Sequence, residues 1–285
     1  MRRRSAVARR RPGCGFFVGS AIAIIPARFH STRLPGKALA LIGGRPMVCH
    51  VAERTRRARG LARVIVATDD QRIAQAIAAT GAEAVLTRAD HPSGTDRLAE
   101  VARTLEAALV VNVQGDLPLL DPAMVEGLVA RMAAEPALPM ATLVSPLRDE
   151  AEWRSPHVVK AVVGAGGRAL YFSRSPIPFD RDGRRAPGEP FGWRHIGMYA
   201  YRRDVLLRLA ALPPSPLERR EQLEQLRALD SAGATSACTP TGGTCSSAWP
   251  RSRPRRSSGG SSWSNSGRSR TALRSGWSNG RRSSP

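Results

Sequence analysis

Short apolar runs alternate with amphipathic segments along the first half of the chain. Four runs of small or branched apolar residues are typical of buried strands. These runs are residues 21–25, 63–68, 84–86 and 109–113. Helical spacing of apolar residues marks the segments between them, which are residues 46–59, 73–80 and 96–106. Alternating strands and helices predict βαβ units and an α/β fold with a mainly parallel sheet, which binds ligands at the carboxyl ends of its strands.

The pattern changes after residue 139, where short strands are separated by turn-rich segments. The predicted strands are residues 140–144, 158–163, 169–173 and 196–201, and a long loop covers residues 180–192. A Ser-Pro-Leu-Glu sequence at residues 215–218 is a capping box with proline at the first helical position. It predicts a single helix that reaches about residue 229.

A polar loop follows the first predicted strand, which we expect Pro26 to end. The loop carries three cations and two hydroxyls, namely Arg28, Ser31, Thr32, Arg33 and Lys37. Cations and backbone N–H groups on a strand-to-helix turn suit a polyphosphate, because the following helix also points its positive end at the turn. The spacing differs from a Walker-type loop, so spacing alone leaves an ordinary basic surface loop as the alternative.

Lysine is rare in this chain. Of 44 Lys and Arg residues, only Lys37 and Lys160 are lysines. Where arginine serves most positions, a retained lysine indicates a place that needs a compact ammonium group. Lys37 therefore favours the phosphate-binding interpretation of the loop. Lys160 lies in an apolar run, where a substrate contact and a structural ion pair remain equally open.

Two polar clusters follow later strands of the parallel part. In His91-Pro-Ser-Gly-Thr-Asp-Arg97, Ser93 or Thr95 can cap the next helix, and Gly94 lets the backbone pass close to a ligand. A capped helix start with no ligand is the alternative for this cluster.

The second cluster is Gln114-Gly115-Asp116, directly after the apolar run 109–113. A carboxylate just beyond a buried parallel strand is where a Mg²⁺-nucleotide enzyme places its metal ligand. Asp121 already caps the helix that begins at Pro122, so capping does not compete for Asp116.

Four polar residues stand out in the second half. They are Arg174, Arg181, His195 and Tyr199. The last two are four residues apart, so one strand would place them on the same face. Ordinary positions on a sheet surface are the alternative for this pair.

The formal net charge of +21 comes mainly from the two ends of the chain. Residues 1–20 hold six arginines and residues 231–285 hold nine, and neither end holds an acid. The modest positive charge between them suits an anionic small molecule. No aromatic-interleaved basic motif or zinc-finger spacing indicates a nucleic-acid partner, and no apolar run is long enough for a membrane span. The four cysteines form no CxxC pair, which favours a reducing cytoplasm.

Several motifs in order resemble the 3-deoxy-manno-octulosonate (KDO) cytidylyltransferases, the CMP-KDO synthetases of lipopolysaccharide synthesis. They are IPARFHSTRLPGKAL, VIVATDD, TRADHPSGTDRLAE, NVQGD, LYFSR and LEQLR, within residues 21–229. The resemblance implies a Rossmann-like nucleotidyltransferase fold with a smaller mixed-sheet region for sugar binding and dimerisation. It also implies the reaction CTP + KDO → CMP-KDO + pyrophosphate, Mg²⁺ as cofactor, and a homodimer.

The resemblance also implies roles for individual residues. Catalysis would rest on Arg28, Lys37 and Asp116, with Asp116 as the metal ligand. The nucleotide-binding positions would be Arg28, Arg33, Lys37, Gly94, Arg174 and Arg181. The sugar-binding positions would be Arg97, Gln114, His195, Tyr199, Glu224 and Gln225.

Two departures from the family leave alternatives open. Leu117 stands where the family usually has Glu, and residues 231–285 lack the family's second acidic motif. This Ser-, Arg- and Gly-rich tail predicts disorder, a missing strand and a frameshifted reading near codon 230. We expect three segments: a disordered basic extension over residues 1–20, the enzyme domain over 21–230, and the tail over 231–285. The alternatives are a nucleotidyltransferase for another acidic sugar, such as a sialic acid, and a catalytically defective member.

Overall fold

The computed structural model describes residues 21–30, 34–183, 185–231 and 236–240, which fall in one compact unit. The early strands and helices are β1 (Ala21–Ala27), η1 (Lys37–Leu39), β2 (Leu41–Ile42), β3 (Arg45–Pro46), α1 (Met47–Arg56), β4 (Leu61–Thr68), α2 (Gln71–Ala78), β5 (Glu83–Leu86), α3 (Gly94–Arg103), β6 (Leu109–Asn112) and α4 (Pro122–Ala134). The later ones are β7 (Met140–Leu147), α5 (Glu150–Arg154), β8 (Lys160–Val163), η2 (Ala165–Gly167), β9 (Ala169–Ser173), β10 (Gly192–Arg202), α6 (Arg203–Ala211), α7 (Pro216–Glu221), α8 (Gln225–Asp230) and β11 (Ser236–Pro240).

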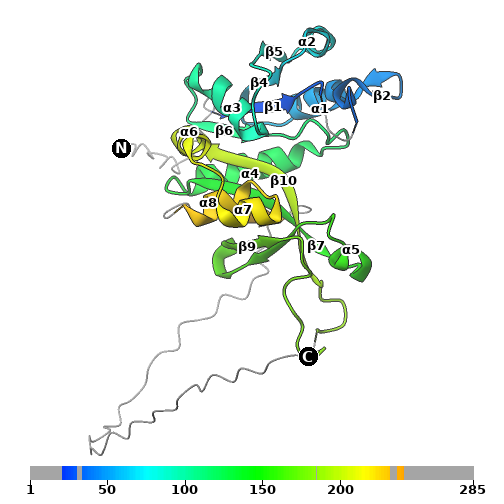
Figure 1. Cartoon of the computed structure of the whole chain (residues 1–285), viewed down its shortest axis with the longest axis vertical. Helices are drawn as coiled ribbons and strands as arrows, with labels where there is room; N and C mark the ends of the chain where they lie inside the picture. Colours follow the sequence, from blue (N-terminus) through cyan, green and yellow to red (C-terminus); the bar gives the residue numbers. More distant parts are fainter. Residues whose placement is uncertain (1–20, 31–33, 184, 232–235, 241–285) are drawn as a thin grey trace, which may run out of the picture. The chain divides into compact units, whose positions relative to one another are not determined.

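A nine-stranded sheet organises the described part of the chain, with the order β11-β7-β10-β6-β1-β4-β5, with β8 paired to β10 and β9 paired to β8 (Figure 1). Strands β6, β1, β4 and β5 are parallel, whereas β10 runs antiparallel to both β6 and β7. The predicted α/β fold is confirmed. The mixed part is continuous with the parallel part rather than a separate sheet.

Helices cover both faces of the parallel strands. Alternate residues of β1 point to opposite faces, so they pack against different helices. Ala23 and Ile25 pack with α1, α2 and α4, whereas Ile22 and Ile24 pack with α3 and α6. A third cluster lies under α7 and α8, where Leu223 and Leu226 meet the strands of the mixed part. The first two clusters hold the parallel strands in register, so their carboxyl ends form one edge of the sheet.

The predicted strands are all present, although several bounds differ. The expectation that Pro26 ends the first strand is wrong, since β1 continues through Pro26 to Ala27. Pairing of β1 with β6 stops at Ile24, while pairing with β4 runs on to Ala27. A proline has no N–H to donate, so it is tolerated where a strand has lost one of its neighbours.

The last predicted helix is wrong as a single element. It is divided into α7 and α8 by Gln222, whose φ of 55° is left-handed. The capping box at its start is confirmed, since Ser215 and Glu218 each accept from the other's backbone N–H. The break turns Glu224 and Gln225 to the start of a new helix, at the edge of the pocket described below.

The structure also corrects one prediction for the tail, residues 231–285, in the part that it describes. The predicted loss of a strand after Asp230 is wrong, because β11 (Ser236–Pro240) pairs in parallel with β7. The predicted extension over residues 1–20 and the rest of the tail, residues 241–285, lie outside the described residues. No helix in the described ranges is long and apolar enough to cross a membrane.

Candidate active site

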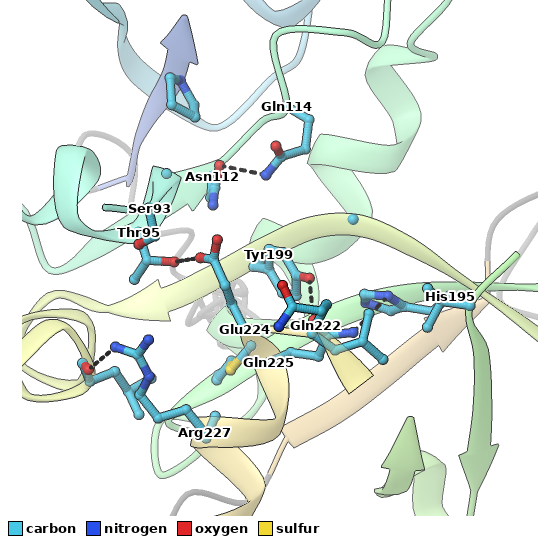
Figure 2. A pocket seen from close by; sticks show the side chains of 18 of the residues that line it. Ser93, Thr95, Asn112, Gln114, His195, Tyr199, Gln222, Glu224, Gln225 and Arg227 are labelled. Atoms are coloured by element: carbon cyan, nitrogen blue, oxygen red, sulfur yellow. Dashed lines mark hydrogen bonds between the residues drawn. The ribbon is translucent and has the colours of Figure 1, made fainter. Parts of the chain in front are cut away.

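A cavity of about 730 Å³ lies at the carboxyl ends of β1 and β6 and against β10 (Figure 2). Eight of the predicted site residues line it. They are Arg28, Gly94, Arg97, Gln114, His195, Tyr199, Glu224 and Gln225. The chain thus brings together groups that are about two hundred positions apart in sequence, at the edge of the sheet where α/β folds bind ligands.

Buried hydrogen-bonding side chains form one wall of this cavity. The Tyr199 hydroxyl donates to Gln225 Oε1 at 3.2 Å, and Gln225 Nε2 lies 3.3 Å from His195 Nδ1 (Figure 2). His195 Nε2 lies 2.9 Å from Thr142 Oγ1. His195 and Tyr199 share a face as predicted, with ring centroids 5.5 Å apart.

Burial controls the protonation of this wall. Desolvation lowers the pKa of His195 from 6.5 to about 3. Desolvation, and then the charge of Glu224, raise the pKa of Tyr199 well above its usual range. The imidazole is therefore neutral and the phenol protonated at physiological pH, so this wall offers neutral hydrogen-bonding groups.

A hydrogen bond joins two residues that line the cavity. Thr95 Oγ1 at the start of α3 donates to Glu224 Oε2 just before α8, at 2.6 Å (Figure 2). Ser93, one of the two predicted caps, is the N-cap of α3 and accepts from the Asp96 N–H. Glu224 is exposed, and besides the bond from Thr95 its carboxylate can accept hydrogen bonds from the hydroxyls of a ligand.

Arg97 is not a free guanidinium. Its side chain is 3% exposed and its Nη2 donates to Asp69 Oδ2 at 3.0 Å, while Nη1 donates to Thr87 Oγ1. The other Asp69 oxygen accepts the Phe29 N–H at 3.1 Å. Arg97 lines the cavity but also braces the polar loop after β1, a role that the sequence did not predict.

Lys37 and Asp116 are placed together as an ion pair. The Lys37 ammonium donates to Asp116 Oδ2 at 2.7 Å, with the side chains 40% and 49% exposed. Two glycines bring the loops together. Gly36 has a left-handed φ of 71°, and a Cβ on Gly115 would lie 2.9 Å from the Pro26 carbonyl oxygen.

Two predicted nucleotide contacts, Arg174 and Arg181, do not line the cavity, and neither does the Lys37–Asp116 pair. Arg174 Nε donates to the Glu221 carbonyl and Nη1 to the Pro156 carbonyl. Arg181 is 90% exposed and faces Asp182 at 3.7 Å. The structure does not bring these two arginines to the cavity, and Arg33 lies outside the described residues.

Among the described residues, Lys160 has carbonyl partners rather than a close ion-pair partner, and it does not line the cavity. The side chain is fully buried, and its ammonium donates to the carbonyls of Ser155, Val158 and Arg174. Desolvation, and then the Arg174 charge, lower the pKa of Lys160. Because Val158 lines the cavity, Lys160 fixes part of its wall through the backbone.

Some residues of the site were missed by the sequence analysis. Asn112 at the end of β6 accepts from Gln114 Nε2 at 3.3 Å and lines the cavity (Figure 2). Its place at the carboxyl end of a buried strand was a usable signal. Thr142 lies in an apolar stretch of β7, where no local pattern marks it.

Comparisons with known proteins give the family. A cytidylyltransferase family model matches residues 22–236. A 3-deoxy-manno-octulosonate cytidylyltransferase from Syntrophotalea carbinolica is 53% identical over 220 residues, which are 75% of this chain and 88% of that protein. The chain belongs to this family. The corresponding protein from Geobacter sulfurreducens is 54% identical over 216 residues, covering 73% of this chain and 86% of the relative.

A solved structure supports the same family. The structure of CMP:2-keto-3-deoxy-manno-octonic acid synthetase complexed with CTP has a TM-score of 0.74 and 48% identity. The match covers 78% of this chain and 90% of that one. The predicted nucleotidyltransferase fold is therefore confirmed. The chain is a member of the KDO cytidylyltransferases, and these matches cover 86–90% of the length of the related proteins.

The metal site predicted for this family member rests on Asp116. In the described part of the chain, no group of three or more His, Cys, Asp or Glu side chains could hold a metal ion. Mg²⁺ commonly binds through one or two carboxylates together with substrate phosphates and water. The exposed Asp116 carboxylate beside the polar loop fits that mode of binding.

Proposed function

We propose that this chain catalyses CTP + KDO → CMP-KDO + pyrophosphate with Mg²⁺ as cofactor. The observation that carries the proposal is the convergence in one cavity of Arg28 and Gly94 with the polar wall of His195, Tyr199 and Gln225. Relatives at 53–54% identity that are named for this activity support KDO rather than a sialic-acid-like sugar. The homodimer and the cytoplasmic location remain predictions.

The reaction requires positioning and charge neutralisation more than covalent catalysis. The anomeric hydroxyl of KDO attacks the α-phosphorus of CTP, an O–P bond forms, and the bond to the β-phosphate breaks to release pyrophosphate. Arg28, Arg33 and Lys37 would stabilise the negative charge on the leaving group. Mg²⁺ held by Asp116 would supply further neutralisation of the phosphate oxygens.

The Lys37–Asp116 ion pair fits this assignment. Both side chains are about half exposed, so solvent screens their attraction and the pair is easily separated. A triphosphate offers Lys37 more negative charge than one carboxylate does. We therefore expect Lys37 to move to phosphate when CTP binds, which would leave the Asp116 carboxylate free for the metal.

We assign KDO to the wall of the cavity that contains Tyr199, Glu224 and Gln225. Glu224 can accept hydrogen bonds from sugar hydroxyls, Gln225 can donate an amide N–H to them, and the Tyr199 hydroxyl adds a third polar group. Arg97 is engaged by Asp69, so a carboxylate of the sugar would share its guanidinium with that ion pair. Arg28 is an exposed cation that lines the same cavity.

Pyrophosphate release with a panel of sugars tests the proposal. The purified chain with CTP and Mg²⁺ should release pyrophosphate with KDO and far less with a sialic acid. Glu224→Gln removes one carboxylate and keeps its shape, so it should raise the KM for KDO about tenfold, with the KM for CTP within about twofold.

A matched variant controls for nonspecific loss of charge. Asp204→Asn removes an exposed acid of α6 that pairs with Arg208 and does not line the cavity. It should leave both KM values unchanged. If Glu224→Gln raised the KM values for KDO and CTP equally, the assignment of KDO to this wall would be wrong. Pyrophosphate release with sialic acid but not with KDO would refute the assignment to KDO.

A further inference from the structure

Four side chains form a continuous hydrogen-bonded chain that leads from the cavity into the sheet. The order is Tyr199, Gln225, His195 and Thr142, and Figure 2 shows the first three. All four are buried, and Thr142 is fully so. Thr142 does not line the cavity, so it can reach a ligand only through the other three.

The far end of this chain is set by an irregularity of β10. Between Ile196 and Tyr199, β10 advances three residues while its partner β7 advances one, from Leu143 to Thr142. The two extra residues include Met198, whose carbonyl oxygen lies 2.9 Å from Thr142 Oγ1. Such an insertion redirects backbone groups that would otherwise face the neighbouring strand.

The Met198 carbonyl decides where the Thr142 proton lies. A carbonyl only accepts, and a threonine hydroxyl has one proton to give. Without that proton between them, two oxygen atoms would face each other at 2.9 Å in a buried site, which is unfavourable. Thr142 therefore donates to Met198, and its oxygen is left to accept.

The remaining protons follow in order. His195 Nε2 must carry a proton to donate to the Thr142 oxygen, and because the ring is neutral, Nδ1 is bare. A bare Nδ1 accepts the N–H of Gln225, which points the amide nitrogen at the ring and Oε1 at Tyr199. Tyr199 then donates to Gln225, so each proton points from the cavity towards the sheet.

We propose that Thr142 is a positioning residue that sets the direction of this hydrogen-bonded chain and thereby the orientation of the Gln225 amide that meets the sugar. In this direction Tyr199 presents its oxygen as an acceptor, and Gln225 presents its second N–H as a donor. In the reverse direction Tyr199 would present its proton instead. The inference rests on the proposed function, in which this wall binds KDO.

The tautomer of His195 is the direct readout. In protein labelled with ¹⁵N-histidine at pH 7, His195 should give the pattern of a neutral ring with a protonated Nε2 and a bare Nδ1. The chain has five histidines, so His195→Gln identifies the signal. This measurement needs no substrate, and it separates a failure of this inference from a failure of the proposed function.

Thr142→Val keeps the shape of the side chain and removes the hydroxyl. His195 should then lose the pure Nε2–H pattern, and the KM for KDO should rise about tenfold, with kcat and the KM for CTP within about twofold. Thr142→Ser should restore both readouts. Thr104→Val is the matched control, because its hydroxyl also donates to a backbone carbonyl, that of Val101, away from the cavity.

Three results would overturn the inference. The first is a wild-type His195 that carries its proton on Nδ1 or is charged at pH 7, which requires no variant to fold. The second is Thr142→Val with an unchanged tautomer and an unchanged KM for KDO. The third is a serine variant that behaves like the valine variant. If the wild type shows the expected tautomer but releases no pyrophosphate with KDO, the proposed function fails.

Discussion

Lowering the pH from 7 to 5 should destabilise the fold through His195 by an amount that the structure allows us to work out. The buried ring has a pKa lowered from 6.5 to about 3 because burial disfavours the charged form. In the unfolded chain the ring regains its ordinary pKa, so the unfolded state binds the additional proton below pH 6.5. The contribution is therefore fully present above pH 6.5 and is lost as the pH falls towards 3.

The magnitude follows from linkage. Between the two pKa values, each pH unit changes the free energy of unfolding by about 1.4 kcal/mol. From pH 7 to pH 5 the ring alone should remove about 2 kcal/mol, since only the part below 6.5 counts. A typical domain has about 5–15 kcal/mol in total, so the loss is large enough to measure.

Urea unfolding of the wild type and of His195→Gln at both pH values isolates this contribution. Glutamine offers an amide N–H at about the reach of Nε2 but does not titrate. Other titrating groups act in both proteins, so at equal protein concentration the variant should lose about 2 kcal/mol less than the wild type. Equal losses would refute the argument, because they would mean that folding does not change the protonation of this ring.

The remaining predictions concern the polar loop and the metal ligand. Lys37→Ala should weaken CTP binding and slow turnover, each about tenfold or more. Lys37→Arg should restore only part of this activity, because a guanidinium does not replace a compact ammonium. Near-normal kcat and KM for CTP in the alanine variant would contradict the loop assignment. Asp116→Asn should preserve the fold and raise the Mg²⁺ concentration for half-maximal activity about tenfold; an unchanged Mg²⁺ titration would remove Asp116 as the ligand.

Local patterns were sufficient to predict strands β1 and β4 to β10, the helix caps and the polar loop, but not the short strands β2 and β3 or the edge strand β11. The apolar run before Pro26, the capping residue Asp121 and the capping box at Ser215 each depend on neighbours within a few positions, and each is present. The left-handed Gln222 was not predictable in the same way. Nothing in the periodicity marks it, and Leu223 and Leu226, which follow the break, pack against the mixed strands.

Much of the lining of the cavity was predictable from the sequence, but the contacts between its side chains were not. Eight predicted residues line the cavity, yet the partners of Arg97 are Asp69 and Thr87, which belong to other segments. Thr142 shows the same limit more clearly. Its role depends on an irregularity in a different strand, β10, and pairing of that kind is decided by the folded sheet rather than by nearby residues.

The tail, residues 231–285, supplies an edge strand of the sheet but no carboxylate for a metal site. An edge strand needs mainly backbone N–H and C=O groups, so many sequences can supply it, and β11 pairs with β7 although residues 231–285 depart from the family pattern. A second metal carboxylate needs an Asp or Glu at one position, and residues 231–285 contain none. The departure therefore bears on the chemistry more than on the fold. Under the proposed function, Mg²⁺ would depend on Asp116 and the substrate phosphates, which is why Asp116 should be more sensitive to substitution than either residue of the Thr95–Glu224 pair.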